Sequence, residues 1–153
     1  MRQFIRHPSN IPIEVRISPG SSYKTSPAKD VSHGGIAFVS DVAVEPGTTV
    51  ELRIPCLKPM IELSAARVEW CRKQANRFII GVRFTDLMET YRIRMVEQIC
   101  HIESYRKYIQ ERHGRHLTVE DAAKEWINRY ASSFPTFQET DKKGEIENNE
   151  GKS

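Results

Sequence analysis

The sequence has no apolar run long enough to cross a bilayer, and no apolar segment follows its first arginines as in a signal peptide. It also has few cysteines. Cys56, Cys71 and Cys100 are widely spaced and form no CxxC pair, which argues against a disulfide framework. We interpret them as small apolar side chains of a core. We therefore expect a cytoplasmic protein that does not insert into membranes.

Motifs of the common catalytic sites are missing as well. There is no nucleophile elbow, no Walker loop and no HExxH pair, so we expect no enzyme and no catalytic residues. Cys100 and His101 are neighbours on a predicted helix and point about 100° apart, which makes a shared metal ion difficult. His113 and His116 lack a matching cysteine pair. We expect neither a metal nor a cofactor.

Dense lysine and arginine runs with interleaved aromatics are also absent, which argues against a nucleic-acid polymer as partner. The 153 residues carry a formal net charge of +3. From Glu139 onward five acids oppose three lysines, so residues 1–138 carry +3 − (−2) = +5. A mildly basic body of this kind favours anionic ligands.

Two arginines, Arg2 and Arg6, lie four residues apart at the start of the chain. Arginine pairs bidentately with phosphate and with the O6/N7 edge of guanine, so two of them can converge on one ligand. The plainer interpretation is a basic, frayed N-terminus.

A polar turn follows a β-type run that begins near Pro27. It contains Asp30, Ser32, Gly34 and Gly35. The two glycines can adopt a positive φ and bring bare backbone close to a ligand, beside a carboxylate acceptor and a hydroxyl. Taken alone, most such turns only reverse the chain.

Together the two patterns resemble the signatures of the PilZ domain, the bacterial receptor for cyclic di-GMP, which are written RxxxR and (D/N)xSxxG. Every specified position agrees, and these positions are Arg2, Arg6, Asp30, Ser32 and Gly35. Residues 66–70 and 80–84 look like later PilZ strands, so the resemblance covers about residues 1–86. It implies a six-stranded antiparallel β-barrel and cyclic di-GMP as the ligand.

The resemblance also implies how the ligand is held. Arg2 and Arg6, on a flexible arm, grip guanine edges and phosphates, while Asp30, Ser32, Gly34 and Gly35 hold the ligand from the barrel. Each charge-assisted contact is worth about 1 to 3 kcal/mol, so losing either arginine should remove most of the affinity. His7 and His33 are candidates for further ligand contacts, such as stacking on a second nucleotide, or else are exposed polar turn residues. One or two nucleotides per chain both remain open.

Alternating apolar positions predict the strands of this barrel. The expected strands are residues 11–17, 26–31, 36–40, 50–54, 61–71 and 78–84. Pro12 predicts a strand start or an unpaired edge. A bulge near Ala66 reconciles the register of the long strand. About six short strands with frequent turns indicate a small barrel or sandwich, in agreement with the resemblance.

The apolar period becomes helical after Asp86, and a first helix should end near His113-Gly114. A second helix should begin at Thr118, whose hydroxyl can cap it, and Phe134-Pro135 should stop it. We thus expect a mainly β protein with a C-terminal α part. Its expected divisions are a barrel with its arm (1–86), a helical extension (87–135) and a disordered acidic tail (136–153).

The leading hypothesis is a non-enzymatic cyclic di-GMP receptor that changes its surface on binding and signals to a protein partner through its C-terminal helices. The main alternative is a PilZ-like adaptor that contacts proteins but binds no nucleotide. A third is a DNA-binding regulator, because residues 118–123 resemble the first helix of a helix-turn-helix. No arginine- and lysine-rich recognition helix follows them, which weakens this third hypothesis.

Overall fold

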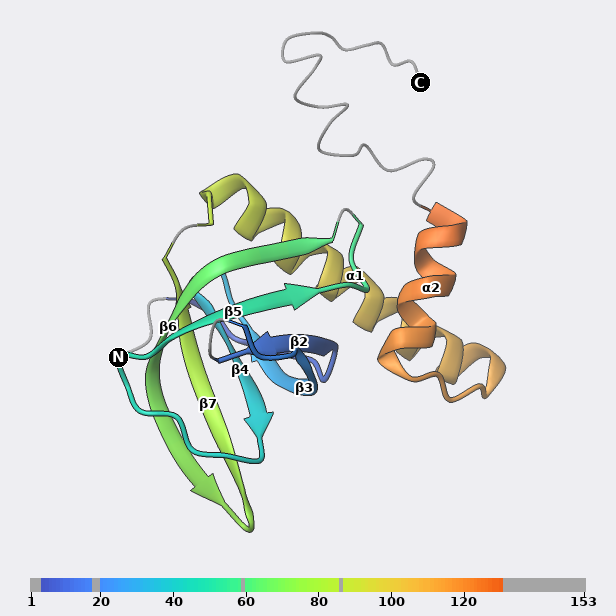
Figure 1. The fold of residues 1–153 in the computed structure, drawn as a ribbon. Coiled ribbons are helices and arrows are strands. Elements are labelled where there is room, and N and C mark those ends of the chain that lie inside the picture. The colour runs from blue at the N-terminus through green and yellow to red at the C-terminus, as the bar shows by residue number, and fades with distance from the viewer. Residues whose placement is uncertain (1–3, 18–19, 59, 86, 131–153) are drawn as a thin grey trace, which may run out of the picture.

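A computed structural model describes residues 4–17, 20–58, 60–85 and 87–130 and shows a small β-barrel joined to two helices (Figure 1). The strands are β1 (His7–Pro8), β2 (Pro12–Arg16), β3 (Lys24–Val31), β4 (Gly35–Ser40), β5 (Thr49–Ile54), β6 (Ile61–Gln74) and β7 (Arg77–Phe84). The helices are α1 (Glu89–His113) and α2 (Val119–Tyr130).

Six of these strands form a closed antiparallel barrel in the order β3-β2-β5-β6-β7-β4, because β4 pairs back onto β3. Strand alternation explains the core: Ile13 and Val15 of β2 point inward, and Leu52 and Ile54 of β5 meet them. β2 begins at Pro12, one of the two positions predicted for it. The predicted barrel followed by two helices is confirmed.

The long strand β6 bends because its ladders contain two irregularities. Against β5 its register shifts between Leu63 and Ala66, and against β7 it shifts between Val68 and Trp70. The first shift confirms the bulge predicted near Ala66. Bulges of this kind increase local twist, which lets one strand pair with two neighbours around a small barrel.

One prediction about the N-terminal strands was wrong. β3 begins at Lys24, before the expected start near Pro27, because exposed polar residues extend its ladder with β2. The segment after Arg6 contains the short strand β1. The chain stays bonded to β3 beyond β1, since Ser9 N donates to Lys29 O (3.2 Å) and Ala28 N donates to Ile11 O (3.0 Å).

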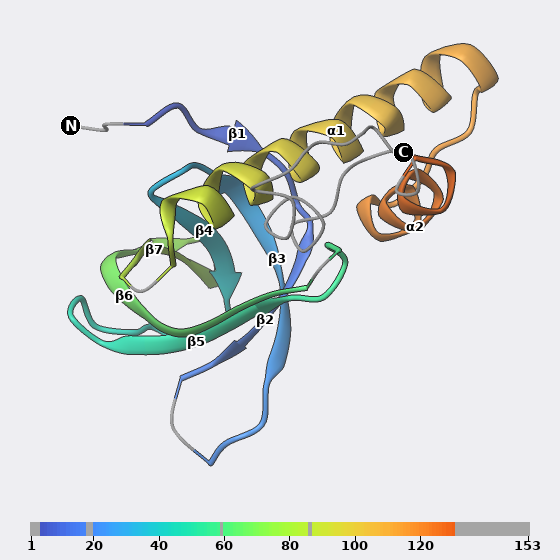
Figure 2. The ribbon, with the colours of Figure 1, turned by 90° about the horizontal axis from the view of Figure 1, so that it is seen from above.

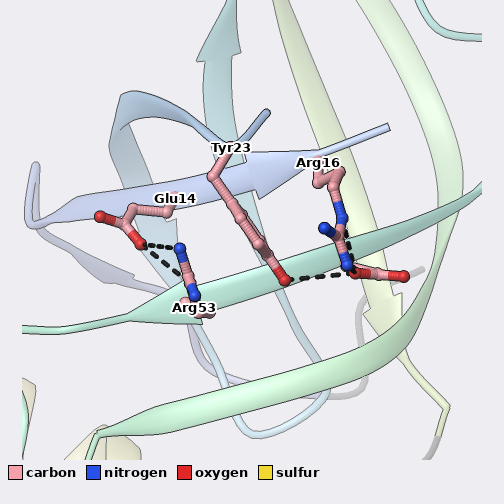
Figure 3. A network of polar contacts seen from close by, with 5 residues as sticks. Glu14, Arg16, Tyr23 and Arg53 are labelled. Carbon is pink, nitrogen blue, oxygen red and sulfur yellow. Dashed lines mark hydrogen bonds and ion pairs between the residues drawn. The ribbon is translucent and has the colours of Figure 1, made fainter. Parts of the chain in front are cut away.

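The short ladder between β2 and β5 is reinforced by polar contacts (Figure 3). Glu14 lies opposite Arg53 and pairs with it at 2.9 Å, and Arg16 lies opposite Glu51 and pairs with it. The hydrogen bond from Arg16 lowers the pKa of the Glu51 carboxyl. Tyr23 lies beside both guanidiniums, 3.6 Å and 4.6 Å from ring centroid to Cζ, so it ties the chain before β3 to this ladder.

Helix α1 lies over the barrel and continues past it (Figures 1 and 2). Met95, Ile99 and Ile102 are almost fully buried in the same core as the strands. The Gln98 amide bonds the backbone N and O of Lys58 at 3.1 Å and 2.6 Å, which ties the helix to the β5–β6 connection. The predicted glycine cap is confirmed, because Gly114 is left-handed (φ 69°).

Helix α2 packs against the part of α1 beyond the barrel (Figure 2). Thr118 Oγ1 accepts a hydrogen bond from Asp121 N (3.0 Å), which confirms the predicted cap. Trp126 stacks on His101 with 5.6 Å between ring centroids, and Tyr105 donates to a Glu125 carboxylate oxygen (2.9 Å).

The predicted end of the second helix at Phe134-Pro135 and the predicted tail 136–153 lie outside the described residues. In the part of the chain that is described, neither helix has the length and apolar character required to span a bilayer.

The cysteines Cys56, Cys71 and Cys100 are free, and they pack half-buried against the core. Burial, and to a smaller extent the charge of Glu120 on α2, raises the pKa of the Cys56 thiol to about 11. The environment of Cys56 therefore reports that α2 lies close to the β5–β6 connection.

We predict slow alkylation of Cys56 in the folded protein. A pKa of about 11 in place of 9.0 leaves about one hundredth as much thiolate at pH 8. Iodoacetamide labelling followed by mass spectrometry, with and without urea, measures this difference. Glu120→Gln should speed the reaction and Lys124→Gln should slow it, because these two charges act on the thiol in opposite directions. Equal labelling rates in the folded and unfolded protein would contradict the packing.

Candidate functional site

The two sequence signatures meet at the end of β3. Arg6 precedes β1, and β1 pairs with β3 so that Pro8 lies opposite Asp30. Arg6 Nη1 donates to Asp30 Oδ1 at 2.5 Å, and only about a quarter of either side chain is exposed. A guanidinium has five N–H donors, so this contact orients the group without exhausting its capacity. The structure thus brings together two candidate residues that are 24 positions apart.

Ser32 shapes the turn between β3 and β4. Ser32 is 5% exposed, and its Oγ accepts hydrogen bonds from Gly34 N (3.1 Å) and Gly35 N (3.2 Å). Its backbone N donates to Gly35 O (2.9 Å), which closes the hairpin. The hydroxyl oxygen is therefore engaged within the turn, and Ser32 acts on anything bound there by fixing the backbone.

The reason predicted for the two glycines was wrong in its geometry. Neither Gly34 nor Gly35 has a positive φ. Gly35 is required by packing, because a Cβ there would lie 2.0 Å from the carbonyl oxygen of Val82 on β7. β4 and β7 pair from this residue onward, so the missing side chain lets the turn start directly at the barrel wall.

Aromatic rings cover the tip of the turn. Phe4 lies against Gly34, and its ring meets that of His33 edge to face with 6.1 Å between centroids. His33 is partly buried at the tip, and His7 is partly buried in β1 opposite Val31. Both histidines thus lie near the turn, and a contact of either with a ligand stays a prediction. Arg2 lies outside the described residues.

Sequence reasoning did not identify the barrel face beside the turn. Gly35 lies opposite Arg83, and two residues further Gly81 lies opposite Trp70 on the same outward side. The indole covers Gly81 so closely that a Cβ there would be 2.2 Å from Trp70 Cε2. The guanidinium of Arg72 lies 4.6 Å from the indole. This face offers an aromatic surface and cations, but the Trp-Gly contact becomes visible only when the strand register is known.

The site has the chemistry of an anion and heterocycle binder. A guanidinium, a carboxylate and an ordered turn backbone lie together beside an aromatic face, and they offer hydrogen-bond donors and acceptors to a ligand. Within the described ranges, no three His, Cys, Asp or Glu side chains are grouped to hold a metal ion.

A comparison with known protein families identifies the family of this chain. The PilZ domain model matches residues 1–100, about two thirds of the chain. The chain belongs to the PilZ domain family. The match extends past residue 86, where the strand pattern ends, and includes the part of α1 that packs into the barrel core. None of the curated proteins compared with this PilZ protein matches it.

Solved structures agree with this assignment. The PilZ domain of CeSA from a cellulose-synthesizing bacterium is 29% identical, with a TM-score of 0.51 over 63% of this chain and 99% of that one. The PilZ domain of YcgR from Escherichia coli, solved with c-di-GMP, is 12% identical, with a TM-score of 0.56 over 74% and 98%. The K. pneumonia MrkH–c-di-GMP complex is 14% identical, with a TM-score of 0.52 over 70% and 54%. This PilZ protein therefore spans about half the length of MrkH.

We predict that Gly35→Ala destabilises the protein strongly. The new Cβ would meet a backbone oxygen at 2.0 Å, and neither β4 nor β7 can yield without losing ladder bonds. Overpacking of this kind costs about 3 kcal/mol. The matched control is Gly34→Ala, whose Cβ meets only a movable phenyl ring. Urea unfolding measures both, and equal stabilities would contradict the close approach.

Proposed function

We propose that this PilZ domain is a non-enzymatic receptor for cyclic di-GMP, with Arg2 and Arg6 on one side of the ligand and the β3–β4 turn on the other. The observation that carries the proposal is the Arg6–Asp30 ion pair, which joins one residue from each signature. The turn contributes the carboxylate of Asp30 and the backbone of Gly34 and Gly35, held in shape by Ser32.

The ligand chemistry suits these groups. Guanine presents O6 and N7 acceptors to a guanidinium, and its N2 amino group can donate to a carboxylate. The two phosphates of the cyclic dinucleotide favour the basic body of the chain.

The contacts already present reduce the entropic cost of binding. Ordering one residue costs about 1 to 2 kcal/mol, which would offset much of a single bidentate contact. Arg6 is held by Asp30 before any ligand arrives, so that residue adds little to the cost. The YcgR and MrkH structures, both solved with c-di-GMP, show that the same fold accommodates this ligand.

A chain of contacts supports signalling from the arm to the helices. Ser9 is buried three residues after Arg6, and its hydroxyl donates to Glu103 Oε2 on α1 (2.5 Å). Arg106 bonds the other oxygen of Glu103 (3.2 Å) and the backbone oxygen of Leu117 (2.8 Å), just before α2. A shift of the arm on ligand binding would therefore reach the α1–α2 connection, where we place the contact with a protein partner.

The alternative function, an adaptor that contacts proteins without nucleotide, is favoured by exposed aromatics on the helices. Tyr108 is 49% exposed and Tyr130 is 41% exposed. Tyrosines of this kind are frequent in protein interfaces. This alternative and the receptor share the helical surface and differ in whether the nucleotide binds.

Calorimetric titration with cyclic di-GMP tests the receptor proposal. We expect the wild type to bind, and we expect Arg6→Ala to weaken binding by about a hundredfold, because it removes a charge-assisted contact worth about 1 to 3 kcal/mol and leaves Asp30 unpaired. Arg77→Ala is the matched control. It breaks another Arg–Asp pair (3.4 Å, with Asp41) at the far end of β7 and should leave affinity unchanged. If the wild type gives no binding heat at millimolar nucleotide, the receptor proposal is wrong and the adaptor function is the one that stands.

Hydrogen exchange tests the signalling path. In the wild type, we expect cyclic di-GMP to change amide exchange in residues 114–118, between the helices. Ser9→Ala and Glu103→Gln should abolish that response while nucleotide affinity stays within about threefold, because both residues lie outside the proposed ligand contacts. Glu97→Gln, an exposed position of α1, is the matched control and should keep the response. A full response in Ser9→Ala would exclude this path.

A further inference from the structure

Phe4 is less exposed than its neighbour Ile5. Phe4 is 42% exposed, whereas Ile5 is 78% exposed. The ring lies on the turn, where a Cβ added to Gly34 would be 2.7 Å from Phe4 Cδ2 and 2.9 Å from Cε2. An apolar side chain thus has a defined place on the polar turn.

Phe4 lies at a bend shortly before β1. Phe4 and Arg6 contact the turn and the end of β3, respectively, while Ile5 between them points to solvent. The arm is therefore attached at two consecutive inward positions, one apolar and one ionic.

We propose that Phe4 is a positioning residue that anchors the arm to the turn before the ligand binds, and so keeps Arg2 within reach of it. This inference rests on the proposed cyclic di-GMP site. Arg2 is four residues from Arg6 and two residues from Phe4 in the sequence, so its greatest possible distance from the anchor is about 14 Å in the first case and about 7 Å in the second. Halving the reach confines Arg2 to about one eighth of the volume, so its local concentration rises about eightfold.

Gly34 is the residue that the Phe4 ring contacts. Its φ is not in the left-handed region, so the backbone there does not demand glycine, and what a side chain would displace is the Phe4 ring. Gly35 makes room for the barrel wall, and Gly34 makes room for the arm. The two adjacent glycines thus serve different parts of the site.

Cyclic di-GMP affinities of paired variants test the anchor. Phe4→Ala should weaken binding about eightfold, Phe4→Tyr should restore it, and Ile5→Ala should change it less than twofold. Gly34→Ala should act like Phe4→Ala, because it displaces the same ring, and the double variant should be no weaker than either single variant. In an Arg2→Ala background, Phe4→Ala should have no further effect. Independent, additive losses would overturn the anchor.

A measurement without nucleotide keeps the inference separate from the proposed function. The ¹H–¹⁵N heteronuclear NOE of the Ile5 amide reports picosecond to nanosecond motion of the arm. It should fall in Phe4→Ala and in Gly34→Ala and stay at the wild-type value in Phe4→Tyr. An unchanged value in Phe4→Ala would overturn the anchor even if cyclic di-GMP binds. A wild type that ignores the nucleotide would remove the receptor function, while the NOE would still decide whether Phe4 holds the arm.

Discussion

The arm and the turn meet because residues 7–16 run antiparallel along one edge of β3. A strand that slips by one residue sends every side chain to the other face, so a buried face fixes the register. Here Ile11, Ile13 and Val15 are buried on that face, and their positions determine where the chain before them must lie. The position of Arg6 beside Asp30 is therefore a consequence of apolar packing further along the same segment. The geometry at the end of β3 thus depends on core residues further along the chain.

Close backbone approach is the second constraint on this face. Gly35 faces the carbonyl of Val82, and Gly81 faces the indole of Trp70, both at distances that no side chain tolerates. The two glycines lie on the adjacent strands β4 and β7. They share the outward side, because Gly35 pairs with Arg83, two residues from Gly81, and Gly81 pairs with Trp70. Their role differs from that of Gly20, Gly47 and Gly114, which have a positive φ and open space around them. The two glycines thus add no side chain to this outward face, and the Trp70 indole can lie against the backbone of Gly81.

Local patterns were sufficient to predict much of this molecule. The alternation in residues 11–17 and the glycine and threonine at the helix ends identified β2, Gly114 and Thr118 correctly, because strands and caps depend on near neighbours. The two signatures also contain Arg6 and Asp30, which the fold joins in an ion pair. What could not be predicted depends on contacts across the fold. The Ser9–Glu103 bond joins residues 94 positions apart, and the reasons for Gly34 and Gly35 are a phenyl ring and a carbonyl on other segments. Neither the spacing of apolar residues nor the composition of the sequence predicts such contacts between distant segments.

The way α1 packs limits what kind of motion can transmit a signal. Met95, Ile99 and Ile102 are part of the barrel core, and burying each such side chain contributes about 1.5 to 3 kcal/mol. Lifting the helix would therefore forfeit several kcal/mol, a large share of the 5 to 15 kcal/mol that is typical for a whole domain. A ligand shifts a conformational equilibrium only by its difference in affinity for the two states. A small displacement of the arm costs much less free energy, so a modest difference in ligand affinity is enough to drive it. The hydrogen bonds from Ser9 through Glu103 and Arg106 to Leu117 run along the helix, and they can shift while the helix stays on the barrel. The exposed α1–α2 connection can therefore move at a lower cost than the buried part of α1.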